Sequence, residues 1–174
     1  MTKASSTRRN ILEATADIVL EEGVLRLTLE AVARRAGISK GGLLYHFPSK
    51  EALVAGLMTQ YVDDFGQQMR VRQERTSLEA YVDLTLSLSD SSRRLEAALL
   101  TATLLNPDLM SPLRERYDAL QDAIVRDSSD PALATLIRLA VDGLWLTDLL
   151  GLASLQGDAR RDLEKRIAEL LREV

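Results

Sequence analysis

Signals that interrupt helices and signals that favour strands are both sparse in this chain, and this combination most constrains its fold. Only four prolines occur, at positions 48, 107, 112 and 131, so long segments lack the residue that breaks helices most strongly. No alternating run of Val, Ile and Thr reaches strand length, whereas apolar residues recur at helical spacing. The sequence therefore predicts an all-α fold of about nine helices.

Capping residues place the expected helix boundaries. Thr76 and Glu79 have the spacing of a capping box, and Asp130 followed by Pro131 combines an N-cap with a proline in the first helical turn. We expect helices over about residues 6–22, 29–36, 39–47, 49–73, from 76 onward, 92–105, 109–127, 131–155 and 159–173.

Composition and charge limit the classes of protein. The chain has no cysteine, which excludes a disulfide scaffold, a thiolate metal site and a cysteine nucleophile. No segment is typical of a signal peptide or long enough to span a bilayer, so we expect a soluble, cytoplasmic protein with no membrane partner. The net charge is −4, yet residues 1–50 hold eight basic and five acidic side chains, or +3, which leaves −7 for the remainder. This asymmetry indicates an N-terminal part that faces a polyanion.

The most specific signal is the segment LTLEAVARRAGISKGGLLYHFPSKEAL, residues 27–53. Two short helices joined by Ala36-Gly37-Ile38 form a helix-turn-helix, because glycine permits the left-handed backbone that reverses the chain within three residues. Small side chains let a helix approach a groove, and donor groups can reach phosphate oxygens. Thr28 and Lys50 flank the unit near helix N-termini, where backbone amides also favour anions. The exposed side of the second helix combines both kinds of residue: Ser39, Lys40, Gly41, Gly42, Tyr45 and His46.

This segment resembles the N-terminal DNA-binding region of the TetR family of bacterial regulators. The resemblance implies a symmetric dimer that places two recognition helices in successive major grooves of a palindromic operator in double-stranded DNA. It also implies that Gly41 and Gly42 allow close approach, and that the DNA contacts come from Thr28, Ser39, Lys40, Tyr45, His46 and Lys50. The matching positions lie within residues 8–55 and include Ile11, Leu12, Ala14, Gly23, Thr28, Ala33, Gly37, Ile38, Ser39, Leu43, Phe47, Lys50 and Leu53.

Two positions depart from the family's commonest pattern. Gly42 and Leu44 stand where many members have threonine, or another side chain, and tyrosine. We therefore expect base reading to depend on Lys40 and Tyr45. An N-terminal arm is expected to add contacts to phosphates or the minor groove through Lys3, Arg8 and Arg9.

Local roles stay open for several of these residues. His46 could hydrogen-bond within the protein, Lys50 could be an ordinary solvated lysine, and Tyr45 could pack against its own domain. Arg34 and Arg35 fit a solvated helix face.

The expected helices at 131–155 and 159–173 carry more apolar surface than one helix face can bury. A helix that is apolar around most of its girth must be covered on two sides. We expect a homodimer through residues 131–173, which the resemblance makes a four-helix interface; the alternative is a central helix within a monomer. The domains are then a three-helix DNA-binding domain over 1–50 and a helical bundle for ligand sensing and dimerisation over 51–174.

By the same resemblance, the chain is a repressor that a small-molecule effector releases from its operator. Aromatic residues and methionine with an occasional buried polar group suit an apolar effector pocket, although the same residue types also form ordinary core. Asp142 is conspicuous because a buried carboxylate without a partner is costly. The candidate pocket residues are Tyr61, Phe65, Tyr81, Leu104, Met110, Tyr117, Asp142 and Trp145.

An enzyme is the least favoured class. Residues 37–41 match the nucleophile-elbow pattern G-x-S-x-G, but that motif needs a preceding strand and a distant histidine, and the only histidine is His46. One histidine and no E-x-x-H pair exclude a di-metal bundle site, so we expect no metal and no cofactor. The alternative from a different class is a helical protein-interaction adaptor that retains a helix-turn-helix.

Overall fold

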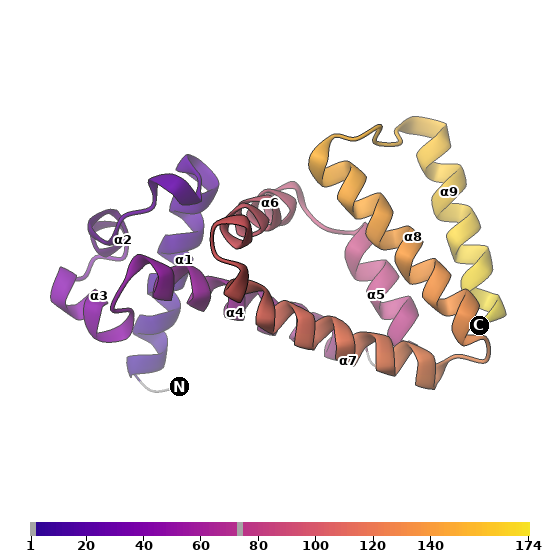
Figure 1. Ribbon diagram of the computed structural model, residues 1–174, viewed down its shortest axis with the longest axis horizontal. Helices are drawn as coiled ribbons and strands as arrows, with labels where there is room; N and C mark the ends of the chain where they lie inside the picture. Colours follow the sequence, from indigo (N-terminus) through magenta and orange to yellow (C-terminus); the bar gives the residue numbers. More distant parts are fainter. Residues whose placement is uncertain (1–2, 73–74) are drawn as a thin grey trace. The chain divides into compact units, whose positions relative to one another are not determined.

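The computed structural model describes residues 3–72 and 75–174. Within these ranges it contains helices and no strand, which confirms the expected all-α fold (Figure 1). The helices and 3-10 turns are α1 (Lys3–Glu22), η1 (Val24–Arg26), α2 (Leu29–Arg35), α3 (Lys40–His46), α4 (Lys50–Val71), α5 (Ser77–Leu86), α6 (Asp90–Leu105), η2 (Pro107–Met110), α7 (Ser111–Asp127), α8 (Pro131–Leu150), α9 (Gly157–Leu170) and η3 (Leu171–Glu173).

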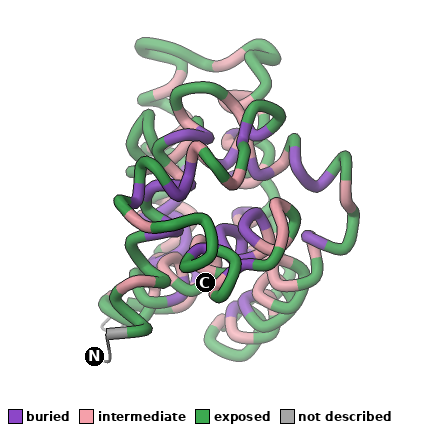
Figure 2. Tube along the Cα trace, turned by 90° about the vertical axis from the view of Figure 1, so that its left-hand side faces the viewer, coloured by how far each residue is buried: buried purple, intermediate pink, exposed green. Residues whose placement is uncertain are grey.

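The chain forms two compact units that each combine separate stretches of sequence. Unit 1 contains residues up to Asp64 together with Asp90–Pro112, and unit 2 contains Phe65–Ser89 together with Leu113–Val174. Helix α4 therefore contributes residues to both units. In each unit, buried positions recur along the helices between exposed ones (Figure 2), as expected for helices that bury one face.

Unit 1 is built around α1, which packs against α2 and α6. Each buried aliphatic side chain contributes about 1.5–3 kcal/mol relative to an exposed one, so this core fixes the short helices that could not form alone. Its most deeply buried apolar side chains are Ile11, Leu12, Ile18, Leu27, Val32, Leu43, Leu53 and Met58.

Unit 2 is built around the contact between α5 and α8. Helix α9 lies beside α8 and adds Ile167 to the same core (Figure 1). The capping box expected at the start of α5 is present: the Thr76 hydroxyl accepts from the Glu79 amide, and the Glu79 carboxylate accepts from the Thr76 amide. Asp130 likewise caps α8 through the amides of Ala132 and Leu133.

Helix α8 ends at Leu150, about five residues before the expected boundary. Gly151 adopts the left-handed conformation with φ of 66°, and the amides of Gly151 and Leu152 both donate to the Thr147 carbonyl. This is a glycine C-cap. The expectation was wrong because apolar residues continue past the cap. None of the helices in the described ranges has both the length and the apolar character needed to cross a membrane.

Candidate nucleic-acid interface

The turn between α2 and α3 has the geometry expected of a helix-turn-helix. Gly37 has a φ of 68°, a left-handed backbone that costs glycine little. The Ile38 amide donates to the Ala33 carbonyl at 3.0 Å. The Asn10 side-chain amide donates to the Ala36 carbonyl at 2.9 Å, so α1 fixes the turn from outside the motif.

Two hydroxyl groups cap the helices of the motif. The Thr28 hydroxyl accepts from the Ala31 amide at 3.2 Å, and the Ser39 hydroxyl accepts from the Gly42 amide at 3.0 Å. Each hydroxyl keeps its own proton for donation to an external oxygen. Helix α2 rather than a strand precedes Ser39, so this serine lacks the context of a nucleophile elbow.

Helix α3 is anchored by one buried residue and leaves most of its surface open. Leu43 is completely buried, and Phe47 just after the helix is buried as well. Tyr45 is 85% exposed, so it does not pack against its own domain. His46 is half-buried and meets the Tyr45 ring edge-on, with centroids 5.2 Å apart. The exposed residues at the start and along the face of α3 are Ser39, Lys40, Gly41, Gly42, Leu44 and Tyr45.

Both lysines of the predicted interface already have partners in the protein. The Lys40 ammonium pairs with the Glu30 carboxylate of α2 at 2.5 Å, and this hydrogen bond lowers the pKa of Glu30. The Lys50 ammonium donates to the Leu25 carbonyl at 3.0 Å. The Leu25 carbonyl has no net charge, so this hydrogen bond positions the Lys50 ammonium beside η1 without neutralising it. Sequence reasoning missed both contacts because neither pair has a regular spacing along one helix.

Three arginines of unit 1 differ in whether their side chains contact the rest of the protein. The Arg8 guanidinium lies 5.1 Å from the centroid of the Phe47 ring, a cation–π distance, and Arg9 is exposed. Arg35 forms ion pairs with Glu21 and Asp17 of α1. Its role is therefore to join α1 to α2. The side chain of Lys3, the third predicted arm residue, lies outside the described residues.

The predicted effector-pocket residues separate into two groups. In unit 2, the Tyr81 hydroxyl donates to the Asp142 carboxylate and lies 3.1 Å from the Tyr117 hydroxyl. The Phe65 ring meets Tyr81 edge-on at 6.1 Å. Burial raises the pKa of Asp142, and Arg138 pairs with this carboxylate at 2.5 Å. The sequence did not predict that partner.

Three of the remaining candidates belong to unit 1, and Trp145 belongs to unit 2. In unit 1, Tyr61 donates to the buried Glu96 carboxylate of α6. Leu104 is 84% exposed, and Met110 is half-buried at the end of η2. Trp145 is half-buried on α8 in unit 2. Residue type alone therefore selected the four side chains that meet around Tyr81 together with others, such as the exposed Leu104, that belong to unit 1.

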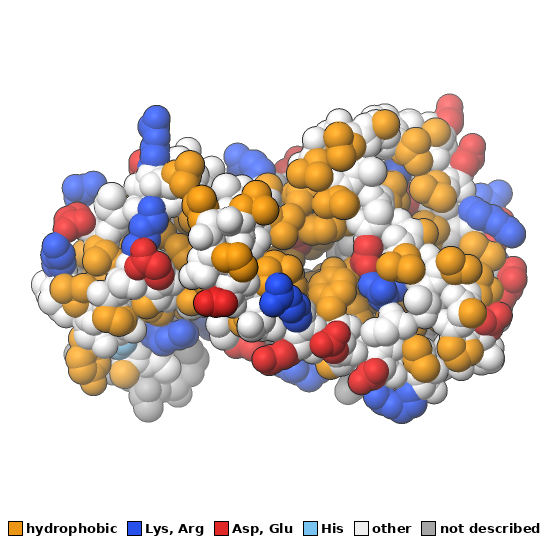
Figure 3. Space-filling view, in the orientation of Figure 1, with side chains coloured by type: hydrophobic (Ala, Val, Ile, Leu, Met, Phe, Trp, Pro, Cys, Tyr) orange, Lys and Arg blue, Asp and Glu red, His pale blue; other side chains and the backbone are white. Residues whose placement is uncertain are grey.

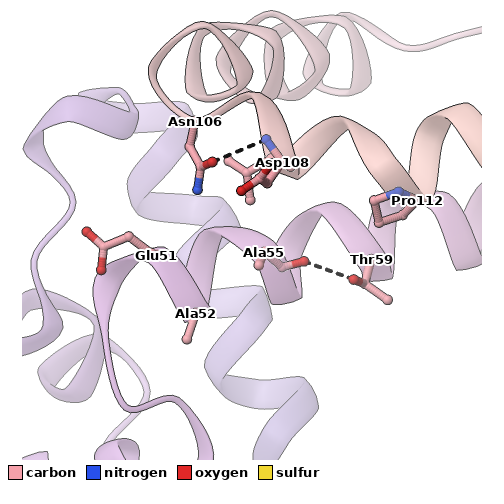
Figure 4. Close-up of a pocket in the computed structure, with 8 residues that line it drawn as sticks. Glu51, Ala52, Ala55, Thr59, Asn106, Asp108 and Pro112 are labelled. Atoms are coloured by element: carbon pink, nitrogen blue, oxygen red, sulfur yellow. Dashed lines mark hydrogen bonds between the residues drawn. The ribbon is translucent and has the colours of Figure 1, made fainter.

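Unit 1 also contains a pocket of about 320 Å³ that none of the predicted residues lines. It lies between the first turns of α4 and the η2 segment (Figure 4). Asn106 accepts from the Asp108 amide at 3.2 Å, and the Thr59 hydroxyl donates to the Ala55 carbonyl at 2.9 Å. These internal hydrogen bonds hold the polar groups of the pocket wall.

Two family models together match most of the chain. Residues 11–57 match the model of bacterial regulatory proteins of the tetR family, and residues 75–172 match the tetracyclin repressor-like C-terminal domain. The two matches define a regulatory protein with an N-terminal helix-turn-helix and a helical C-terminal domain. This chain belongs to the TetR family of bacterial regulatory proteins.

Individual relatives agree with this assignment. The HTH-type transcriptional regulator RutR of Escherichia coli K12 is 34% identical over 89 residues, which is 49% of this chain and 42% of RutR. The chain thus matches less than half of that relative. The crystal structure of SCO7518 from Streptomyces coelicolor A3(2) is 26% identical with a TM-score of 0.71, covering 95% of this chain and 98% of SCO7518.

A third similar protein was solved with a ligand. The multidrug-binding protein EbrR, complexed with ethidium, has a TM-score of 0.69 over 96% of this chain and 97% of EbrR. At 23% identity this likeness shows the fold alone.

Proposed function

We propose that this protein is a transcriptional repressor that binds a palindromic operator as a homodimer and is released by a small-molecule effector. The observation that carries the proposal is the exposed face of α3, which a fully buried Leu43 holds on the surface of unit 1. A short helix with small residues at its start fits the major groove of B-DNA.

The residues of α3 have separate roles in the proposed contact. A Cβ added at Gly41 would meet no atom within 4 Å, so glycine there serves neither packing nor backbone strain. Its use is to let the helix backbone approach the DNA. Tyr45 and Lys40 supply hydroxyl and ammonium donors to base edges, while Thr28, Ser39, His46 and Lys50 contact phosphates. On binding, the Lys40 ammonium leaves the Glu30 carboxylate and contacts the DNA.

A stripe of exposed apolar residues on α8 supports the homodimer. Leu136, Leu139, Leu146 and Leu150 are 63%, 51%, 41% and 56% exposed, and Ala140 and Gly143 lie between them on the same side. Hydrophobic side chains gather at the surface over α8 and the connection to α9 (Figure 3). Exposed apolar surface of this extent is typical of a protein interface. A second copy of α8 around a twofold axis would cover it.

The proposed effector mechanism is supported by the position of α4 in both units and by the similarity of the fold to EbrR. Because α4 contributes residues to both units, a ligand that changes its position in unit 2 would also move the end of α4 that follows α3. The EbrR complex with ethidium supports a ligand site in this fold. An effector releases the operator only to the extent that it binds the non-operator conformation more tightly.

Selection of bound fragments from a random pool of duplex DNA tests the proposal. We expect enrichment of one inverted repeat, with binding that weakens steeply as salt rises because phosphate contacts release counterions. Failure to enrich any sequence, with the protein folded by circular dichroism, would contradict the proposal and favour a helical interaction adaptor.

A further inference from the structure

A groove in unit 2 carries an excess of positive charge. It has a volume of about 340 Å³ and lies among the end of α4, the start of α5 and one face of α7. Four of the described residues that line it are arginines, and Asp127 is the one acidic residue among them. The remaining wall is mostly apolar and includes Met69, Ala80, Ala119, Leu120 and Ala123.

Arg116 is the least compensated of these cations. Its Nε atom is buried and has no hydrogen-bond partner, and no carboxylate pairs with its guanidinium among the described residues. The group is held by packing instead, 5.7 Å from the centroid of the Phe65 ring and over the backbone at Gly66. Burial lowers the pKa of Arg116, and the charge of Arg70 lowers it further. An unpaired buried donor normally costs free energy.

The other charges of the groove are unequally neutralised. Arg72 and Arg75 share one carboxylate, that of Asp83, at 2.9 and 3.3 Å. Arg70 forms no ion pair within residues 3–72 and 75–174. The Asp127 carboxylate accepts from the Ser77 hydroxyl at 2.6 Å and pairs with none of the described arginines. Among the described residues, the four arginines exceed the carboxylates of Asp83 and Asp127 by about +2 beside an apolar wall, and neither Arg70 nor Arg116 pairs with a carboxylate.

We propose that this groove binds a small organic anion, whose carboxylate or phosphate lies between Arg70 and Arg116 and whose apolar part contacts Met69, Ala119 and Leu120. An oxyanion there supplies the acceptor that the Arg116 Nε lacks and separates two like charges. The apolar wall excludes inorganic ions as the preferred occupants and favours an amphiphilic ligand.

The position on α4 makes this anion a candidate effector. That role rests on the proposed function, whereas anion binding itself does not. The two are therefore measured separately, binding on DNA-free protein and release on the protein–operator complex.

Isothermal titration of DNA-free protein with sodium hexanoate, hexyl phosphate and hexanol tests the binding. We expect at least one anion to bind about tenfold or more tightly than hexanol. Arg116→Gln should weaken that binding about tenfold or more, while Arg114→Gln, an exposed arginine of the same helix outside the groove, should leave it unchanged. Asp127→Asn should strengthen it, because the amide oxygen can still accept from Ser77 while the negative charge is lost.

Each outcome decides the question. Preference for hexanoate or for hexyl phosphate identifies the head group and supports the site. Equal binding of hexanol, no binding of either anion, or undiminished binding by Arg116→Gln overturns it. If circular dichroism shows Arg116→Gln unfolded, Arg70→Gln and the gain of affinity in Asp127→Asn carry the test. Anion binding without operator release would leave the site standing and remove only its effector role.

Discussion

Gly41 and Gly56 are both helical glycines, but their surroundings give them opposite functions. Gly41 faces open space, whereas a Cβ at Gly56 would lie 2.6 Å from Cε1 of Phe47. Gly41 is therefore available for a partner outside the molecule. Gly56 is needed inside it, because it lets α4 approach the residue that follows α3.

Gly41→Ala should separate stability from DNA affinity. Alanine favours a helix over glycine by up to about 1 kcal/mol, so the melting temperature should be unchanged or higher. Operator affinity, measured by fluorescence anisotropy, should fall about tenfold or more because the added methyl group holds the backbone away from the groove. Equal affinity would contradict close approach at this position.

Gly56→Ala should instead destabilise the protein. The new methyl group overlaps the Phe47 ring and lies 3.3 Å from Leu12 Cδ2, and overpacking of this kind costs about 1–3 kcal/mol. This exceeds the gain from helix propensity, so we expect a net loss on the order of 1 kcal/mol in urea unfolding. An unchanged unfolding midpoint would show that Phe47 moves freely.

Residue-level predictions succeeded where the signal is local. The N-caps at Thr28 and Ser39 and the left-handed Gly37 follow from residue type and position within a few residues. The pairing of Lys40 with Glu30 joins two helices, and Arg116 and Arg70 come from distant parts of the sequence. No local spacing predicts such contacts, so the groove was not visible from sequence.

Among the elements, α5 depends on a pH-sensitive contact at its side. The hydrogen bond from Arg72 and the charge of Arg75 lower the pKa of Asp83 below its ordinary value of 3.8. A carboxyl whose folded pKa is depressed stabilises the folded state above its unfolded pKa, and this contribution disappears as pH falls through the folded pKa.

Asp83→Asn should therefore lower the melting temperature at pH 7 and have a much smaller effect near pH 2. Thermal unfolding followed by circular dichroism at both pH values measures the difference. Asp118→Asn, an exposed carboxyl of α7 with no ion pair to a described residue, should have little effect at either pH. An equal loss of melting temperature at both pH values would show that Asp83 acts through packing and not through its charge.

The helix pattern was predictable because apolar spacing and caps are properties of single elements. The early end of α8 was the exception: Gly151 supplied a stop signal, but Leu152 and Leu155 continued the apolar pattern. The extra apolar surface of α8 was also predicted, and four of its leucines are in fact more than 40% exposed. The sequence of one chain does not show which surface covers these leucines, because that depends on how the subunits assemble.

At the scale of the whole molecule, the proposed assembly is a homodimer through α8. Leu139→Arg places a charge in the middle of the exposed stripe, so we expect a monomer by light scattering with helix content unchanged. Val125→Arg, at an exposed aliphatic residue of α7, should leave the protein a dimer by the same measurement. A monomeric wild-type protein, or a dimer that tolerates Leu139→Arg, would place the subunit contact elsewhere.

The central claim is that two copies of α3 enter the major groove of one operator. The chain has no cysteine, so Leu44→Cys, at an exposed position of α3, provides a unique attachment point for a DNA-cleaving iron chelate. We expect two clusters of strand cleavage, related by the operator's symmetry and separated by about 10–10.5 base pairs or a multiple of it. A single cluster, or no cleavage from a complex that forms normally, would contradict the claim.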